Sequence, residues 1–428
     1  MREIGIGLLG CGVVGSGTVR VLTENADEIS QRVGAKLVVR KVAVRDTNKQ
    51  RTVALEPGVL TGNPDDVLND PSIDIVAELI GGVEPAHGYI LRAIQNGKNV
   101  VTANKELMAK QGHDLMLAAS TAKKDFFLEG SVAGGIPILA AMKESLAGNR
   151  TRELMGIVNG TTNYILTRMT EEGAEFASTL KAAQELGYAE ADPTSDVDGF
   201  DAQYKLAILT SIAFNTTLGA DDIAAQGIRQ IGARDIAVAK ELGYRIKLVA
   251  KARDEGEGRI QAHVHPALLP VKHPLASVND VFNAVLVRGD AVGDVMFYGR
   301  GAGSLPTGSA VVGDLIACAR NILADSTGRV GCTCYSQREV VPISDVESKY
   351  YIRLNALDKP KVLASIANVF GDFDVSIESV VQKALPNEEA EIVWVTHVAR
   401  EANIRGALDV ISRLSVVKSV NNWIRVEE

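Results

Sequence analysis

The stretch EIGIGLLGCGVVGSGTVRVL, residues 3–22, decides how the N-terminal part of the chain folds. We expect a short buried strand from Ile4 to Leu9, followed by three glycines and an apolar-periodic helix. Gly10, Gly12 and Gly15 have the spacing G-x-G-x-x-G. The first glycine permits a tight turn, the second lets backbone approach a pyrophosphate, and the third brings helix close to strand. This order predicts a Rossmann-type, doubly wound α/β domain that binds a dinucleotide at the helix N-terminus.

The second strand, within KLVVRKVAVRD (residues 36–46), bears on which dinucleotide binds. An NAD site normally offers a lone carboxylate there, whereas an arginine suits the 2′-phosphate of NADP. Arg45 precedes Asp46, and Lys49 and Arg51 follow. We expect NADP, or use of both NADP and NAD; the alternative is a solvated basic turn. Lys105 follows another predicted strand, in KNVVTANKEL, at the edge where such sheets bind ligands.

Composition narrows the class of protein. A chain of 428 residues with 46% apolar and 23% charged residues suggests two or three globular domains. A net charge of −8 without a long basic run argues against nucleic acid or membrane as the main partner. Four cysteines form no disulfide framework and suggest reduced thiols in the cytoplasm. The apolar N-terminus contains LLGC, which is similar to a lipoprotein cleavage box, but it lacks the charged flank of an export signal.

A glycine-rich bend, FFLEGSVAGGIPIL (residues 126–139), follows the nucleotide-binding half. Such a bend around Glu129 turns several carbonyls inward, and hard cations bind to oxygen. The alternative is a tight inter-domain turn. Beyond it, GIVNGTTNYIL predicts a strand, a turn at Asn159 and a helix that Thr161 or Thr162 caps.

The acidic stretch GYAEADPTSDVDGFDAQYKLAIL, residues 187–209, is no calcium loop, because Lys205 falls where an EF-hand needs its closing glutamate. A helix beginning near Phe200 would put Asp201 in its first turn and Lys205 one turn later on the same face. Carboxylates beside the lysine would hold and tune it, although a structural ion pair is the alternative.

These residue types match one kind of chemistry. Hydride transfer from a nicotinamide to an aldehyde leaves an alkoxide, which an ammonium group can protonate. Carboxylates such as Glu190 and Asp201 could hold a substrate's own amino group. An oxidising aldehyde dehydrogenase would need a nucleophilic cysteine, and neither Cys11 nor Cys318 is well placed for that role. Zinc-assisted reduction is also unsupported, because no Cys/His cluster has ligand spacing and the HVH pair alternates along a strand.

Six stretches in the first 325 residues together resemble the homoserine dehydrogenase family. In chain order they are GLLGCGVVG, VVTANKEL, EGSVAGGIPI, GIVNGTTNYIL, GYAEADPTSDVDGFDAQYK and GRGAGSLPTGSA. The resemblance implies a reversible NAD(P)-dependent reduction of L-aspartate 4-semialdehyde to L-homoserine, a step in threonine, methionine and isoleucine biosynthesis. It also implies dimerisation through the sheet of the middle domain, and hence a homodimer or homotetramer.

The resemblance also implies roles for particular residues. Lys205 would be the proton donor, and Lys105 a second catalytic lysine that contacts the cofactor. Glu190 and Asp201 would contact substrate, with Asp196 close by. The cofactor would contact Gly10, Cys11, Gly12, Val13, Val14, Gly15, Arg45, Lys105 and Gly303. A sodium or potassium ion would be bound at Glu129, Val132, Gly134 and Ile136, largely through carbonyls.

The last 79 residues, 350–428, are expected to alternate as β-α-β-β-α-β, a ferredoxin-like order that resembles an ACT domain. That resemblance implies threonine as a feedback effector and assembly beyond a dimer. The family usually has glycine after the proline of DKPKV, where Lys361 stands here, so a purely oligomerising module is the alternative.

Residues 1–130 are predicted to form the nucleotide-binding domain, which a return helix at about 304–325 completes. Residues 131–303 are predicted to form an α+β catalytic and dimerisation domain. Residues 326–349 would form a linker before the ACT-like domain. Two other functions stay open: another NAD(P)-dependent semialdehyde or amino-acid dehydrogenase, and a non-catalytic nucleotide or amino-acid sensor. The chain has no room for an aspartate kinase domain.

Overall fold

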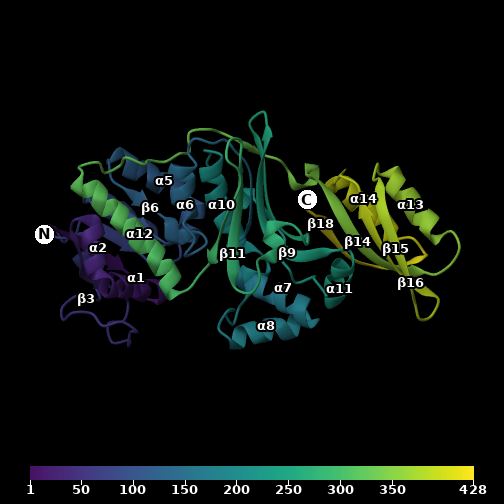
Figure 1. Cartoon of the computed structure of the whole chain (residues 1–428), viewed down its shortest axis with the longest axis horizontal. Coiled ribbons are helices and arrows are strands. Elements are labelled where there is room, and N and C mark those ends of the chain that lie inside the picture. Colours follow the sequence, from purple (N-terminus) through teal and green to yellow (C-terminus); the bar gives the residue numbers. More distant parts are fainter. The chain divides into compact units, whose positions relative to one another are not determined.

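The computed structural model describes all 428 residues, coloured along the sequence in Figure 1. The chain divides into two compact units, each assembled from three segments. Unit 1 comprises residues 1–154, 204–222 and 282–338, and unit 2 comprises residues 155–203, 223–281 and 339–428. The domain boundaries given above stay a prediction.

Unit 1 contains a parallel six-stranded sheet with the strand order β3-β2-β1-β4-β5-β6. The strands are β1 (Glu3–Leu9), β2 (Lys36–Ala43), β3 (Leu60–Thr61), β4 (Ile75–Glu78), β5 (Asn99–Thr102) and β6 (Phe126–Phe127). This strand order confirms the predicted Rossmann-type fold. The sequence of strands runs outward in opposite directions from the point between β1 and β4, and ligands bind at that point in such sheets.

Helix α12 (Ser304–Leu323) returns to the N-terminal region and lies beside α1 (Val13–Glu24), as Figure 1 shows. Glycines permit this close approach. A Cβ on Gly17 would lie 2.0 Å from the carbonyl oxygen of Ser304, and one on Gly308 would lie 2.6 Å from the carbonyl carbon of Gly17. The two helices therefore cross almost backbone to backbone, and the start of α12 lies next to the start of α1.

The remaining elements of unit 1 are mostly helical. The helices are α2 (Ala26–Val33), α3 (Asp65–Leu68), α4 (Ala86–Gln95), α5 (Lys105–Thr121), α6 (Ile138–Ala140) and the π-helix Ala141–Ser145. Strands β11 (Phe282–Gly289) and β12 (Gly293–Arg300) form an antiparallel hairpin. Two elements cross the division between the units: β7 (Thr151–Ile157) and α10 (Phe200–Ala213). Within unit 1, α5 contacts α10, since the Lys110 ammonium lies 5.4 Å from the ring centroid of Tyr204.

Unit 2 contains a second sheet in which six long strands follow in the order β9-β10-β18-β14-β16-β15. They are β9 (Tyr244–Gly256), β10 (Arg259–Pro270), β14 (Glu347–Leu357), β15 (Ile377–Leu385), β16 (Glu389–Thr396) and β18 (Val417–Val426). The helices of unit 2 are α7 (Gly160–Glu172), α8 (Phe176–Glu185), α9 (Thr194–Val197), α11 (Ala233–Glu241), α13 (Val362–Asp372) and α14 (Glu401–Ile411). The short strands are β8 (Ala224–Ala225), β13 (Glu339–Val340) and β17 (Ala399–Arg400).

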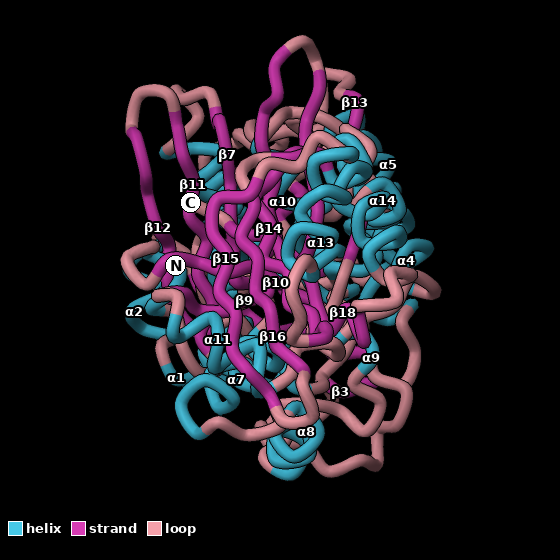
Figure 2. Tube along the Cα trace, turned by 90° about the vertical axis from the view of Figure 1, so that its right-hand side faces the viewer, coloured by secondary structure: helices cyan, strands magenta, loops and turns pink.

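The C-terminal elements run β14-α13-β15-β16-α14-β18, with the short β17 before α14, and this confirms the predicted β-α-β-β-α-β order. The last strand pairs in parallel with β10, so the ACT-like sheet continues the sheet of the preceding domain. Figure 2 shows the long strands of this sheet together.

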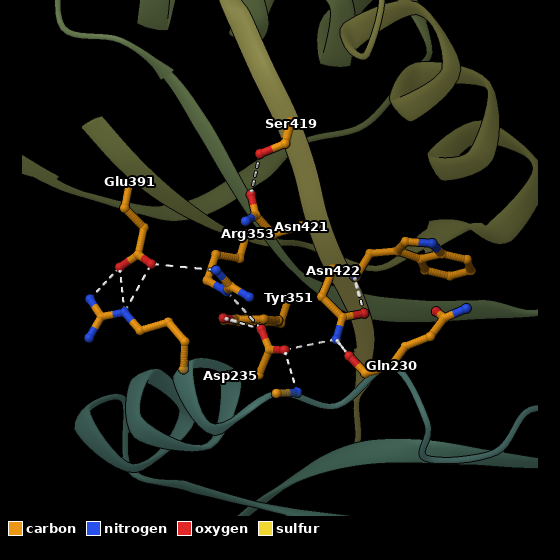
Figure 3. A network of polar contacts seen from close by, with 11 residues as sticks. Gln230, Asp235, Tyr351, Arg353, Glu391, Ser419, Asn421 and Asn422 are labelled. Atoms are coloured by element: carbon orange, nitrogen blue, oxygen red, sulfur yellow. Dashed lines mark hydrogen bonds and ion pairs between the residues drawn. The ribbon is translucent and has the colours of Figure 1, made fainter. Parts of the chain in front are cut away.

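The two faces of β14 contact different parts of unit 2, because successive side chains along a strand point to opposite faces. Tyr350, Ile352 and Leu354 are buried in the core beneath α13 and α14. On the other face, the Arg353 guanidinium donates a 2.7 Å hydrogen bond from Nε to Oδ1 of Asp235 on α11. Asn422 donates a 3.0 Å bond to the other oxygen of Asp235. Figure 3 shows this network, which fastens the ACT-like sheet to α11.

Candidate active site

The glycine-rich loop between β1 and α1 forms one wall of a cavity of about 590 Å³. A Cβ on Gly10 would lie 2.7 Å from the Leu79 carbonyl oxygen, and one on Gly15 would lie 2.5 Å from the Gly10 carbonyl oxygen. Nothing lies within 4 Å of a Cβ built on Gly12. The surrounding backbone therefore leaves no room for a side chain at Gly10 or Gly15. At Gly12 the space beside the backbone is open. The loop fits the phosphates of a dinucleotide.

Gly303 lies next to this loop. It precedes α12 with φ of 122°, in the region that favours glycine. The Ser304 hydroxyl donates a 2.8 Å hydrogen bond to the carbonyl of Val13. The structure therefore brings Gly303 near the predicted cofactor loop, although its contact with the cofactor stays a prediction.

The far end of the cavity is basic. Arg45, Asp46, Lys49 and Arg51 all line it. The Arg51 guanidinium donates 2.7 Å hydrogen bonds to the carbonyls of Lys49 and Asp46, so it orders the turn. Arg45 is exposed at the cavity edge. All three basic side chains therefore lie at the cavity, and their contact with a ligand stays a prediction.

A buried carboxylate that sequence reasoning missed organises the loops at the ends of β4 and β5. Glu78 accepts hydrogen bonds of 2.8 Å from the backbone of Ile80 and from the Thr102 hydroxyl. Thr102 Oγ1 in turn accepts a 3.1 Å bond from the backbone N–H of Asn104. The Asn104 side chain accepts from Leu107 N and so caps α5, which begins at Lys105. The signal was a charged residue inside the otherwise apolar stretch IDIVAELIGG.

The bend at residues 129–136 begins at a buried carboxylate that accepts hydrogen bonds from nearby backbone. Its Glu129 carboxylate is 6% exposed and accepts hydrogen bonds of 2.8 and 2.6 Å from the backbone of Leu139 and Ala140. Burial raises the pKa of Glu129 despite these bonds. Ala133 and Gly134 have φ of 53° and 50°, which turns the chain sharply. Both oxygens of the Glu129 carboxylate already accept hydrogen bonds from the protein backbone. A cation bound here would therefore be coordinated mainly by the backbone carbonyls of the bend.

The acidic segment places two of its predicted residues together. The Asn159 amide donates hydrogen bonds of 2.6 Å to Asp196 and 2.8 Å to Asp201. Helix α10 begins at Phe200, as predicted, and Asp201 is 3% exposed. Glu190, by contrast, is exposed on the loop before α9. The predicted caps Thr161 and Thr162 were wrong: Asn159 Oδ1 accepts from Thr162 N and caps α7.

Lys205 lies one helical turn after Asp201 on α10 and is 6% exposed. A lysine this buried is a candidate for a chemical role rather than a solvated charge. Lys105 is half-buried at the start of α5, the helix that contacts α10 in unit 1. The two lysines therefore come from neighbouring helices.

The structure brings together a group of cysteine and histidine side chains that has no ligand spacing in the sequence. The ligand atoms of His113, Cys332 and Cys334 lie within 4.8 Å of one another. Spacing could not show this cluster because His113 lies on α5, far from the two cysteines in the chain. The apolar N-terminus forms the buried strand β1. None of the helices has the length and apolar character that a membrane span requires.

Comparison with known proteins shows the family to which this chain belongs. Family models match residues 10–129 (homoserine dehydrogenase, NAD binding domain), 137–316 (homoserine dehydrogenase) and 350–416 (ACT domain). A homoserine dehydrogenase of Synechocystis sp. is 47% identical, with 98% of this chain and 99% of the relative covered. This chain belongs to the homoserine dehydrogenase family. It is therefore an NAD(P)-dependent oxidoreductase that carries a C-terminal ACT domain.

Other members of the homoserine dehydrogenase family extend the match. The homoserine dehydrogenase of Bacillus subtilis is 43% identical, covering 100% of this chain and 99% of its own. The crystal structure of a homoserine dehydrogenase from Thiobacillus denitrificans has a TM-score of 0.94 at 45% identity, covering 100% and 99% of the two chains. A hyperthermophilic archaeal homoserine dehydrogenase in complex with NADPH matches 74% of this chain and 98% of its own, with a TM-score of 0.63 at 27% identity.

Proposed function

We propose that this enzyme reduces L-aspartate 4-semialdehyde to L-homoserine reversibly, as a step in threonine, methionine and isoleucine biosynthesis. The observation that carries the mechanism is the burial of Lys205, one turn after the equally buried Asp201 on α10. When bound, the reduced nicotinamide supplies a hydride to the aldehyde carbon. The Lys205 ammonium donates the proton that the resulting alkoxide oxygen needs.

Substrate recognition is proposed for the acidic residues. The α-ammonium group of the substrate pairs with Asp201, with Asp196 nearby, and with Glu190 from the exposed loop. Asn159 supports this assignment because its amide holds Asp196 and Asp201 in fixed positions. Asn159 itself is a positioning residue, since it acts through the two carboxylates.

Lys105 is proposed as the second lysine of the site, in contact with cofactor and substrate. The hydrogen bonds from Glu78 through Thr102 to Asn104 fix the start of α5, where Lys105 stands. A fixed helix start matters because misplacing a reacting or positioning group by about 1 Å can cost about 100-fold in rate.

For the cofactor we propose NADP, with use of NAD as well. Support comes from Arg45 and Lys49 at the cavity edge, where their charges suit a 2′-phosphate. The glycine loop, Gly10 through Gly15, would hold the pyrophosphate, including the backbone of Cys11, Val13 and Val14. A solved relative described in complex with NADPH is consistent with this preference.

A sodium or potassium ion is proposed at the bend formed by Glu129, Val132, Gly134 and Ile136. Carbonyl oxygens suit such a hard cation. The positive φ values of Ala133 and Gly134 support the proposal because they let a short segment turn several carbonyls the same way. Burial raises the pKa of both Glu129 and the neighbouring Asp314, so a bound cation would favour the charged forms of these two carboxyl groups.

The ACT domain is proposed to bind an amino-acid effector, threonine, in a homodimer or homotetramer. Lys361 stands at the N-cap of α13 with φ of 72°, a left-handed conformation that glycine adopts at no cost. This conformation supports the idea that the position is built for glycine. We propose that the lysine side chain, which glycine would lack, crowds the effector site. A purely oligomerising module is the alternative.

One experiment separates these functions. The purified enzyme is mixed with NADPH and aspartate 4-semialdehyde, glyoxylate or pyruvate, and the absorbance of NADPH is followed. We expect turnover with the semialdehyde alone. Turnover with another carbonyl compound and none with the semialdehyde would assign a different dehydrogenase. No turnover with any of the three would favour a sensor.

A further inference from the structure

A cluster of metal-binding side chains lies outside the site described above. His113 comes from α5, and Cys332 and Cys334 come from the irregular segment 327–338 between α12 and β13. All three residues are partly buried, and all belong to unit 1. Two thiols and an imidazole whose ligand atoms lie within 4.8 Å of one another form the donor set of a transition-metal site.

The donor set and its dimensions favour zinc. Zinc binds thiolate at about 2.3 Å and imidazole at about 2.1 Å, so ligands of a tetrahedral ion lie roughly 3.5 Å apart. The limit of 4.8 Å exceeds that spacing by an amount that small side-chain rotations can close. Thiolates exclude the hard cations magnesium and calcium, which bind oxygen. The site is thus chemically distinct from the carbonyl-lined bend at residues 129–136.

Neighbouring groups hold the ligands in place. The Thr217 hydroxyl lies 3.2 Å from Nδ1 of His113, which fixes the orientation of the imidazole ring. The backbone N–H of Cys334 donates a 3.3 Å hydrogen bond to the sulfur of Cys332. Metal sites characteristically have such second contacts, because they orient the ligands before the ion arrives. These contacts set the cluster apart from a chance meeting of side chains.

Three protein ligands leave a fourth position for a small ligand. A cavity of about 70 Å³ adjoins the cluster and is lined by His113, Cys334 and Thr217, among others. That volume admits a water molecule as the fourth ligand of a tetrahedral ion. The protein thus supplies both the donors and the space.

We propose that His113, Cys332 and Cys334 bind one zinc ion, which fastens segment 327–338 to helix α5. Lys105 is the first residue of that helix, and His113 lies two turns beyond it. Between them, Gln111 has non-helical φ and ψ of −138° and 15°, so the helix is interrupted there. The segment also leads to β13 and the ACT domain. The ion would therefore join the helix that carries Lys105 to the connection before the regulatory domain.

The test uses cobalt(II) as a spectroscopic substitute for zinc. The full-length enzyme, reduced and stripped of metal with a chelator, is titrated with Co²⁺. We expect one ion per chain, a thiolate-to-cobalt charge-transfer band and the intense visible bands of a tetrahedral site, all removed by added Zn²⁺. Cys332→Ser, Cys334→Ser and His113→Gln should each weaken binding at least about tenfold. Cys318→Ala and His87→Gln, which change a cysteine and a histidine outside the cluster, should bind as wild type.

A second measurement tests the fastening itself. Zn²⁺ should slow tryptic cleavage after the exposed Arg329 in the wild type, but not in Cys332→Ser. The proposal is overturned if reduced wild type gives no thiolate–cobalt band, or if the cysteine variants bind cobalt as tightly as wild type. It is also overturned if protein purified without oxygen and under reducing conditions carries a Cys332–Cys334 disulfide by mass spectrometry.

Discussion

The Oε2 atom of Glu78 accepts a 2.8 Å hydrogen bond from the hydroxyl of Thr102, and both side chains are fully buried. The bond joins the ends of β4 and β5, two strands at the ligand-binding edge of the sheet. It also fixes the backbone that leads to Lys105.

Glu78→Gln should therefore weaken both stability and catalysis. The amide would direct N–H groups where the carboxylate now accepts, so we expect a loss of about 1–3 kcal/mol in the free energy of unfolding. Turnover should fall as well, because the start of α5 loosens. Urea denaturation and steady-state kinetics measure the two effects. Glu106→Gln, one residue after Lys105, is the control, because it removes an exposed ion pair with Lys110. Equal losses of stability and turnover in the two variants would contradict the role of Glu78.

The pair of Arg353 and Asp235 is expected to hold the ACT domain to α11 (Figure 3). Their side chains are 10% and 1% exposed, so Arg353→Ala leaves the buried Asp235 carboxylate without its ionic partner. Breaking such a pair typically costs about 3–5 kcal/mol. Thermal denaturation should show this loss. Arg413→Ala removes the exposed pair with Asp409 and should change stability by less than about 1 kcal/mol.

Two buried histidines on β10 should make the enzyme sensitive to acid. His263 and His265 lie with their Nδ1 atoms 2.8 Å apart, and His265 Nε2 lies 3.1 Å from Glu427. Burial, and then the positive charge of Arg425, lowers the pKa of His265 from 6.5 to about 4. The unfolded chain therefore binds the proton first as the pH falls. Stability is full above pH 6.5 and decreases toward pH 4, by on the order of 3 kcal/mol from this group.

Denaturation of the wild type and His265→Gln at pH 7 and pH 5 measures this effect. The difference in stability between the two pH values should shrink in the variant. His397→Gln removes an exposed histidine and should retain the wild-type difference. Equal wild-type stability at both pH values would contradict the assignment of His265 as a buried neutral residue.

Lys361→Gly should relieve strain at the start of α13. Its φ of 72° is unfavourable for a residue with a Cβ, so glycine should raise the free energy of unfolding by up to about 1 kcal/mol. If the side chain also crowds the effector site, the variant should be more strongly inhibited by threonine. Lys359→Gly, at an exposed neighbour without positive φ, should not stabilise the protein. A destabilised Lys361→Gly would show that the backbone is not strained there.

The Rossmann-type fold, the β-α-β-β-α-β order and the start of α10 could be predicted because they follow from local sequence patterns. Gly10 and Gly15 are required by contacts to nearby backbone, and Phe200 begins the helix that carries Lys205. The prediction of the residue that caps α7 was wrong because Asn159 and the two threonines are all good capping residues. The choice depended on Asn159 also holding Asp196 and Asp201, which come later in the chain.

Other parts of the site could not be predicted because they depend on residues far apart in sequence. Glu78 was hidden as a single charge in an apolar strand, and its partner Thr102 ends a different strand. His113 meets Cys332 and Cys334 only after α5 and the segment following α12 have folded together. Spacing rules detect metal ligands within one loop or helix, and this cluster combines a helix with a segment that lies about 220 residues later in the chain.

The central claim is that Lys205 protonates the alkoxide formed by hydride transfer. Lys205→Met should keep the fold and bind NADPH with wild-type affinity, measured by the fluorescence of the bound cofactor. With aspartate 4-semialdehyde, kcat should fall by about 100- to 10,000-fold. Lys181→Met, at an exposed lysine on α8, should keep wild-type kcat. A Lys205→Met enzyme that turns over at the wild-type rate would contradict the mechanism.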